Sequence, residues 1–241
     1  MPETRPRGDA TRDALVAAAT AVFSHDGFHA ASTRAIADAA GVRQALIGYH
    51  FQSKQGLYLA VFEHIAKKLE ERLGPVADAI DAALSAPARP DRKSASRSRH
   101  LELLLALVDQ MVGVLAGDES APWAQLIVRE QREPTQAFEI LYERFFARLA
   151  RLLTRLVQRI RGGIDEPHAR LTVVTILGQM LVFRIGRAGV LRLLGWSTLG
   201  EKELALIRSH LRETIAAQLS ADPRPRARAR KIAALPGKAK R

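Results

Sequence analysis

The feature that most constrains how this chain folds is residues 32–54, which read as two short helices joined by a sharp turn. Ser32 is a good N-cap for a helix starting at Thr33, because its hydroxyl can accept a hydrogen bond from an otherwise unpaired first-turn amide. Ala37 is small where a second helix must cross closely. Gly41 lies where the chain must turn sharply, a position that favours a residue without a Cβ. The stretch therefore predicts a helix-turn-helix.

The second helix of this motif, expected over about residues 43–50, carries polar side chains on its outward face. These are the side chains of Arg43, Gln44, Tyr49 and His50. They can donate hydrogen bonds to base edges or phosphates, whereas a purely structural helix needs only solubility. Arg43 suits the O6/N7 pair of guanine, Gln44 suits N6/N7 of adenine, and Ala45 suits a thymine methyl group. The pattern predicts a helix that docks in the major groove of DNA.

The spacing of these residues resembles the DNA-binding domain of the TetR/AcrR family of transcriptional regulators. The resemblance is carried by Ala37, Gly41, Val42 and Ile47, followed by Tyr49-His50-Phe51 and Ser53-Lys54. It implies that Tyr49, His50 and Lys54 bind phosphates, with Thr33 on the flanking strand. Family members usually carry an aromatic residue at the position of Gly48, which we include among the expected DNA-binding residues. The alternative is a helical hairpin of another all-α protein with Ala and Gly at the same offsets.

The composition favours helices throughout. Hydrophobic residues make up 47% of the 241 residues and aromatic residues only 5%, which suits Ala- and Leu-rich helices better than sheets. The chain has no cysteine, so thiolate zinc sites, disulfides and cysteine nucleophiles are excluded, and a reducing cytoplasm is the expected compartment. The longest apolar stretch, residues 171–183, is shorter than the roughly 20 residues that cross a bilayer. We expect an all-α protein with no membrane partner.

The net charge of +12 favours a polyanionic partner, but its distribution matters more than its size. Residues 221–241 hold eight basic residues against one acidic residue, 8 − 1 = +7, whereas residues 1–54 hold six against five, 6 − 5 = +1. The helix-turn-helix is therefore indicated by the arrangement of its residues and not by bulk charge. The basic end supports an alternative function, a non-specific or architectural nucleic-acid binder driven by its tail.

Four parts are expected along the chain. Residues 1–8 form a flexible arm, 9–70 the helix-turn-helix domain with its motif at about 32–51, 71–220 a helical regulatory and dimerisation domain, and 221–241 a disordered basic tail. Apolar periodicity predicts helices over residues 11–25, 33–40, 43–50, 54–73, 76–86, 98–116, 121–132, 135–161, 166–187 and 201–219. The Gly74-Pro75 pair is expected to separate two helices, and most of residues 87–100 to form a loop.

Residues 130–148 resemble the C-terminal regulatory domain of CecR-type family members. The resemblance implies a homodimer formed by the two C-terminal helices, an inverted-repeat operator, and a small effector that releases a repressor from DNA. Apolar surroundings with few polar groups favour a hydrophobic or aromatic effector. The candidate lining residues are Trp123, Phe138, Tyr142, Gln179 and Arg184.

An enzyme is not expected. No glutamate has a histidine three residues on, so the paired motifs of a di-iron bundle are missing from the sequence. The phosphate-binding glycine loops and the His-Glu-x-x-His zinc motif are missing as well. The sequence therefore predicts no cofactor, no metal site and no catalytic residue.

Overall fold

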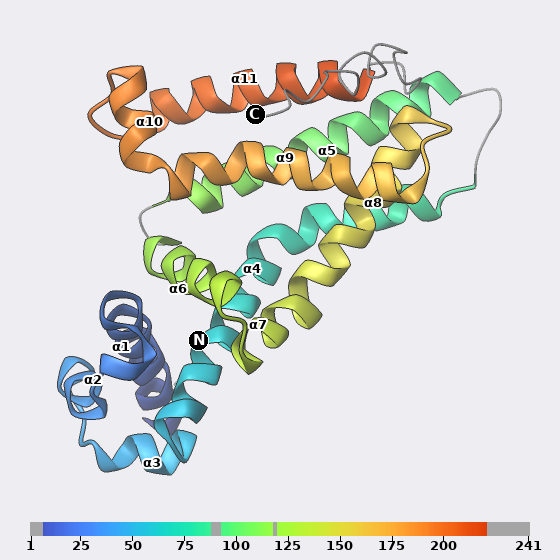
Figure 1. Cartoon of the computed structure of the whole chain (residues 1–241). Coiled ribbons are helices and arrows are strands. Elements are labelled where there is room, and N and C mark those ends of the chain that lie inside the picture. Colours follow the sequence, from blue (N-terminus) through green and yellow to red (C-terminus); the bar gives the residue numbers. More distant parts are fainter. Residues whose placement is uncertain (1–6, 88–92, 118–119, 221–241) are drawn as a thin grey trace, which may run out of the picture.

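The computed structural model describes residues 7–87, 93–117 and 120–220, and every regular element in these ranges is helical (Figure 1). The N-terminal part holds α1 (Arg7–Ala30), α2 (Thr33–Ala39), α3 (Ala45–Phe51) and α4 (Lys54–Ser85). The remainder holds α5 (Lys93–Ala116), α6 (Ala121–Arg132), α7 (Gln136–Leu141), the π-helical segment η3 (Tyr142–Phe146), α8 (Ala147–Arg161), α9 (Glu166–Ile185), α10 (Arg187–Leu194) and α11 (Glu201–Ser220). The all-α prediction is confirmed. Predictions for residues 1–6 and 221–241 lie outside the described residues.

The helix-turn-helix forms as the local signals predict. The Ser32 hydroxyl accepts hydrogen bonds from the amides of Arg34 and Ala35 at 3.2 and 3.4 Å. Gly41 turns the chain with a φ of 67°, a conformation that L side chains rarely adopt. Ile36 and Ile47 are buried between the helices. One boundary differs, since the second helix begins at Ala45 and not near residue 43, so that Arg43 and Gln44 lie in the turn before it.

The predicted break at Gly74-Pro75 is wrong, because α4 continues through Pro75 to Ser85 as one helix. A proline inside a helix removes one backbone hydrogen bond and opposes continuation by about 3 kcal/mol. The buried stripe of Leu73, Ala77 and Ile80 runs across the proline at helical spacing, so packing on one face offsets that penalty. A single element thus connects the helix-turn-helix to the far end of the molecule (Figure 1).

Other boundaries also differ from the prediction. The first helix reaches Ala30 and is broken by Gly27, which has a φ of 81°. Residues 93–97, expected in a loop, form the start of α5. The helix predicted over residues 135–161 is divided into α7, η3 and α8, and an additional helix, α10, follows α9. Ser53 and Asp165 cap the starts of α4 and α9, each accepting a hydrogen bond from a first-turn amide.

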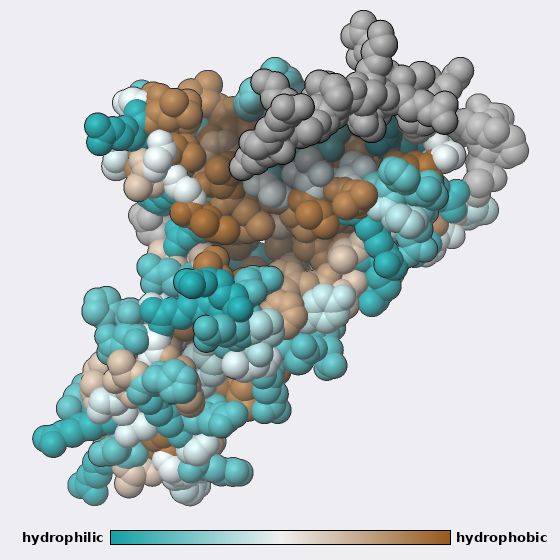
Figure 2. Space-filling model, viewed as in Figure 1, coloured by the Kyte–Doolittle hydropathy of each residue, from teal (hydrophilic) through white to brown (hydrophobic). Residues whose placement is uncertain are grey.

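The C-terminal part packs α5 against α4, α8, α9 and α11. Most of its exposed large apolar side chains lie on α9 and α10, where Figure 2 shows brown surface. In the described part of the chain, α9 is the one helix long and apolar enough to cross a membrane by length and composition, and only 28% of its apolar stretch is buried. The exposed apolar side chains of α9 equally suit a helix that packs against a protein surface.

Candidate nucleic-acid interface

The turn before α3 and the first residue of α3 present the three residues expected to read bases. Arg43, Gln44 and Ala45 are all exposed. The Gln44 amide donates a hydrogen bond to the Thr33 hydroxyl at 2.9 Å, which joins the two helices of the motif and fixes the direction of the Gln44 side chain. The structure therefore brings Thr33 and Gln44, both expected to contact DNA, into direct contact with each other.

The middle of α3 presents the expected phosphate-contacting residues. The Tyr49 side chain is 80% exposed, and its ring meets the His50 ring edge-on with centroids 4.9 Å apart. The opposite face of the helix holds Ile47 and Phe51 in the core. Burial of these two side chains fixes the orientation of α3, so the polar residues of the predicted interface share its outward surface.

Gly48 lies exposed on this same surface. A Cβ built there meets no atom within 4 Å, and its φ is not in the left-handed region. The fold of the chain alone therefore does not require glycine at this position. The role of Gly48 as a DNA-binding residue remains a prediction.

We predict that Gly48→Ala raises the free energy of unfolding by about 0.5–1 kcal/mol, because alanine restricts the unfolded chain and favours helix. We also expect it to lower operator affinity. Urea unfolding and binding to a labelled operator measure the two effects separately. Gly189→Ala is the matched control, since Gly189 is also an exposed helical glycine whose Cβ would meet nothing. If both variants bind the operator as the parent does, Gly48 is not a DNA-contact position.

Lys54 has a structural role that the sequence did not predict. Its ammonium group donates a hydrogen bond to the His29 carbonyl at 3.1 Å and lies 4.9 Å from the centre of the Phe28 ring. Both partners belong to the end of α1, so Lys54 joins the start of α4 to α1. A phosphate contact by Lys54 would use the donors that remain on the same ammonium group.

A buried polar contact joins the helix-turn-helix region to α6, and the sequence analysis missed it. Glu130 is 4% exposed and accepts hydrogen bonds from the Tyr58 hydroxyl at 2.9 Å and from the amide and hydroxyl of Thr135 at 2.9 and 2.8 Å. Burial, and then the hydrogen bond to the Glu130 carboxylate, raise the pKa of Tyr58 above its usual value. The Tyr58 hydroxyl therefore remains the proton donor at physiological pH.

The neighbouring residue on α6, Arg129, binds the C-terminal part of α1 through hydrogen bonds. The Arg129 guanidinium donates to the carbonyl oxygens of Phe23 and His25 at 3.2 and 3.4 Å. A Cβ on Gly27 would overlap this guanidinium, so glycine there provides both the turn and the room. Arg129 and Glu130 together attach α6 to α1 and α4.

The five candidate effector residues are distributed over four elements, α6, α7, η3 and α9. Trp123 is buried on α6 with the Arg72 guanidinium 5.3 Å from its ring, and Phe138 stacks with Tyr142 at 5.9 Å. Gln179 on α9 donates a hydrogen bond to Gln218 on α11 at 3.0 Å, and Arg184 is half-exposed near the end of α9. Of these five residues, Phe138 and Tyr142 are in direct contact with each other.

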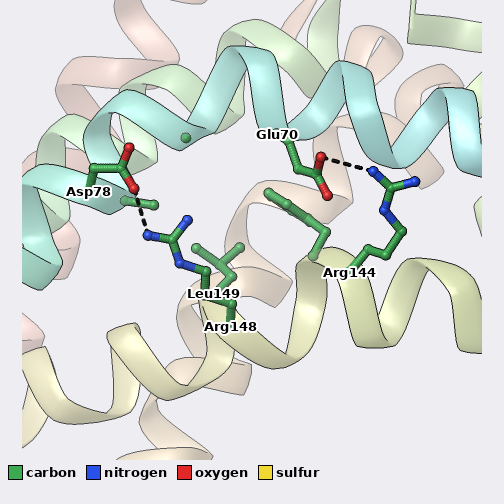
Figure 3. Close-up of a pocket in the computed structure, with 8 residues that line it drawn as sticks. Glu70, Asp78, Arg144, Arg148 and Leu149 are labelled. Atoms are coloured by element: carbon green, nitrogen blue, oxygen red, sulfur yellow. Dashed lines mark hydrogen bonds and ion pairs between the residues drawn. The ribbon is translucent and has the colours of Figure 1, made fainter.

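The described residues of the C-terminal part line hollows that include the following two. The smaller, of about 270 Å³, lies between α4 and the η3–α8 segment (Figure 3). Its rim carries two ion pairs, Glu70 with Arg144 at 3.1 Å and Asp78 with Arg148 at 2.6 Å. The larger, of about 720 Å³, is formed by the ends of α4 and α8 and the start of α5. No group of three or more potential metal ligands occurs among the described residues.

Comparisons with known proteins agree with this architecture. Residues 15–61 match the family described as bacterial regulatory proteins, tetR family, and residues 101–221 match the C-terminal domain of the HTH-type transcriptional dual regulator CecR. CecR of Shigella flexneri is 34% identical over 203 residues, which cover 83% of this chain and 87% of that protein.

Solved structures share the fold at lower identity. A TetR-like regulator from Rhodococcus sp. RHA1 superposes with a TM-score of 0.61 at 18% identity, covering 91% of this chain and all of that one. FadR from Bacillus subtilis, solved in complex with stearoyl-CoA, superposes with a TM-score of 0.55 at 16% identity, covering 84% and 96%. The chain therefore belongs to the TetR family, is a DNA-binding transcriptional regulator rather than an enzyme, and carries a C-terminal domain of the CecR type.

Proposed function

We propose that this regulator binds an inverted-repeat operator as a homodimer, represses transcription, and leaves the DNA when a small effector binds. The observation that carries the proposal is the exposed, polar start of α3, held outward by the burial of Ile47 and Phe51. Exposed hydrogen-bond donors of this kind can contact base edges and phosphates, so DNA is the partner this surface suits best. A regulator of this kind acts in the cytoplasm, at the nucleoid.

On DNA, Arg43 pairs with guanine O6 and N7 and Gln44 with adenine N6 and N7, while Ala45 meets a thymine methyl group. Docking exchanges the hydrogen bond between Gln44 and Thr33 for contacts to the base and the flanking phosphate. Tyr49, His50 and Lys54 bind phosphates, and Gly48 allows the backbone to approach. In a dimer two such helices lie about 34–36 Å apart, in successive major grooves.

We place the dimer interface on the two long C-terminal helices, α9 and α11. Support comes from the exposed apolar side chains of Leu171, Val174 and Ile185 on α9, each more than 60% exposed in the single chain. Apolar surface of this kind gains free energy when a second copy covers it.

The proposed effector is a small hydrophobic or aromatic molecule, with Trp123, Phe138, Tyr142, Gln179 and Arg184 as candidate contacts. The proposal is supported by α6, because this helix carries Trp123 near its start and Arg129 and Glu130 near its end. A ligand that shifts α6 would disturb the contacts to α1 and α4, provided that it binds one arrangement more tightly than the other. Titration calorimetry with a panel of apolar and aromatic compounds, with operator binding as the second readout, tests this part.

We expect Arg43→Ala to lose discrimination at one base position of the operator, with a loss of about 1–3 kcal/mol in operator binding. The arginine would contribute two charge-assisted hydrogen bonds to one guanine. Operators are first selected from genomic fragments, and binding is then measured on all single-base variants of the selected site. Arg151→Ala on α8, which also removes an exposed arginine, should leave the profile unchanged.

An Arg43 variant with the parent's preference at every position would contradict the assignment of base reading.

The competing function is non-specific nucleic-acid binding through basic residues 221–241. Deleting these residues distinguishes the two functions. A specific regulator keeps its operator preference after the deletion. A tail-driven binder loses nearly all affinity and its dependence on salt.

A further inference from the structure

The larger hollow lies at the far end of the molecule from α3. Its walls are the last turn of α4 with Pro87, the first turns of α5, and the last turn of α8 with Gly162. These three helix ends meet on the right of Figure 1, whereas α3 lies at the lower left. DNA held by α3 therefore does not reach this hollow.

The charge of the hollow is strongly positive. Its lining includes Arg97, Arg99, Arg159 and Arg161, and no carboxylate side chain appears among the described residues that line it. The smaller hollow differs, because Glu70 and Asp78 neutralise its two arginines. A concave surface lined by one sign of charge concentrates the electrostatic field and attracts ions of the opposite sign.

Helix stability does not explain two of these arginines. Cations stabilise the C-terminal end of a helix, which accounts for Arg159 and Arg161 in the last turn of α8. Arg97 and Arg99 are the fifth and seventh residues of α5, so they gain nothing from the dipole of their own helix, and the first turn of α5 holds no acidic residue. A bound anion would interact favourably both with these arginines and with the start of the helix.

The pKa of His100, a buried residue in the lining of the hollow, is affected by the same arginines. The side chain is 7% exposed, and burial followed by the repulsion of Arg159 and Arg99 holds the pKa of His100 below its usual value, against the opposing effect of its hydrogen bond to the Ala83 backbone. The imidazole is therefore neutral at physiological pH, and the arginines supply the charge.

We propose that this hollow binds a small molecule carrying a multiply charged phosphate group next to an apolar body. Guanidinium groups match phosphate oxygens in pairs, and several arginines in one hollow require a ligand with more than one negative charge. Ala83, Leu84 and Ile160 in the same lining provide an apolar wall, and 720 Å³ is in the range of small-molecule sites. This ligand class differs from the hydrophobic effector proposed above. Binding at this site can be measured without DNA, so the test does not depend on operator recognition.

The test is calorimetric titration of the full-length chain with inorganic tripolyphosphate at physiological salt. The parent should bind in a saturable manner with one site per chain. Arg97→Gln combined with Arg159→Gln should weaken binding at least about tenfold, since two charge-assisted contacts are removed. Arg151→Gln combined with Arg192→Gln removes the same charge from exposed positions outside the hollow and should leave affinity within about twofold of the parent.

Two results overturn the proposal. One is the absence of saturable binding to the parent, and the other is an equal loss in both double variants, which would assign the affinity to general surface charge or to residues 221–241. The single variant Arg97→Gln should give an intermediate loss and provides a second measurement if the double variant is unstable. Operator binding by the parent, measured separately, shows whether the proposed function stands whatever the outcome at this site.

Discussion

Val174→Glu on α9 is expected to convert the dimer into a monomer and to lower operator affinity by about 10²–10⁴-fold. That factor is the usual gain when two linked modules engage two sites together, and a monomer loses it. The individual helix-turn-helix should remain folded and bind a half-site weakly. The effect is large because one substitution acts on both copies of the interface at once.

The geometry of α9 explains the choice of position. The exposed apolar residues of α9 recur at helical spacing and therefore share one face of the helix. They are Leu171, Val174, Leu181, Val182 and Ile185. Gly178 lies between them, is exposed, and leaves open space around its Cβ position, which allows a second helix to approach closely. A glutamate at position 174, which is 65% exposed in the single chain, costs little in a monomer but is desolvated in the dimer.

Light scattering coupled to gel filtration measures the mass, and titration of the selected operator measures the affinity. Ala150→Glu on α8 adds the same charge at an exposed position and should leave both unchanged. A Val174 variant that remains dimeric with the parent's affinity would move the interface to another surface. The apolar face of α9 would then need a different partner.

Local signals predicted the helix-turn-helix because each one acts over a few residues. The Ser32 cap and the Gly41 turn depend on neighbours within the motif, and the structure confirms them. The recognition helix starts two residues late because the turn that precedes it extends to Gln44, a boundary that periodicity does not define. Contacts to DNA remain predictions, since they depend on a partner outside the chain.

Most of the features that the sequence did not predict depend on residues far apart in the chain. Leu73, Ala77 and Ile80 hold α4 together across Pro75, and their packing partners come from later helices. The start of α5 was read as a loop because its basic residues resemble a solvated segment. Glu130 lies 72 residues from Tyr58 in sequence, so no local pattern marks it as buried. The helix-turn-helix fold could therefore be predicted from sequence, whereas its connection to α6 required the structure.

Glu130→Ala should lower the free energy of unfolding by about 3–5 kcal/mol and weaken the attachment of α6 to the helix-turn-helix region. The substitution leaves the Tyr58 hydroxyl and the two donors of Thr135 without their shared acceptor in a buried site. Tyr58→Phe removes one donor, so we expect a smaller loss of about 1–3 kcal/mol. Urea unfolding at fixed protein concentration measures both variants.

The matched control is Glu133→Ala, three residues further along and exposed at the end of α6, which should change stability by less than about 0.5 kcal/mol. In a double-mutant cycle, the effects of Tyr58→Phe and Glu130→Ala should not add, because both break the same hydrogen bond. If their effects add, or if Glu130→Ala is no worse than the control, the buried carboxylate does not hold the two regions together. Coupling of an effector site to α3 would then run through the continuous helix α4 alone.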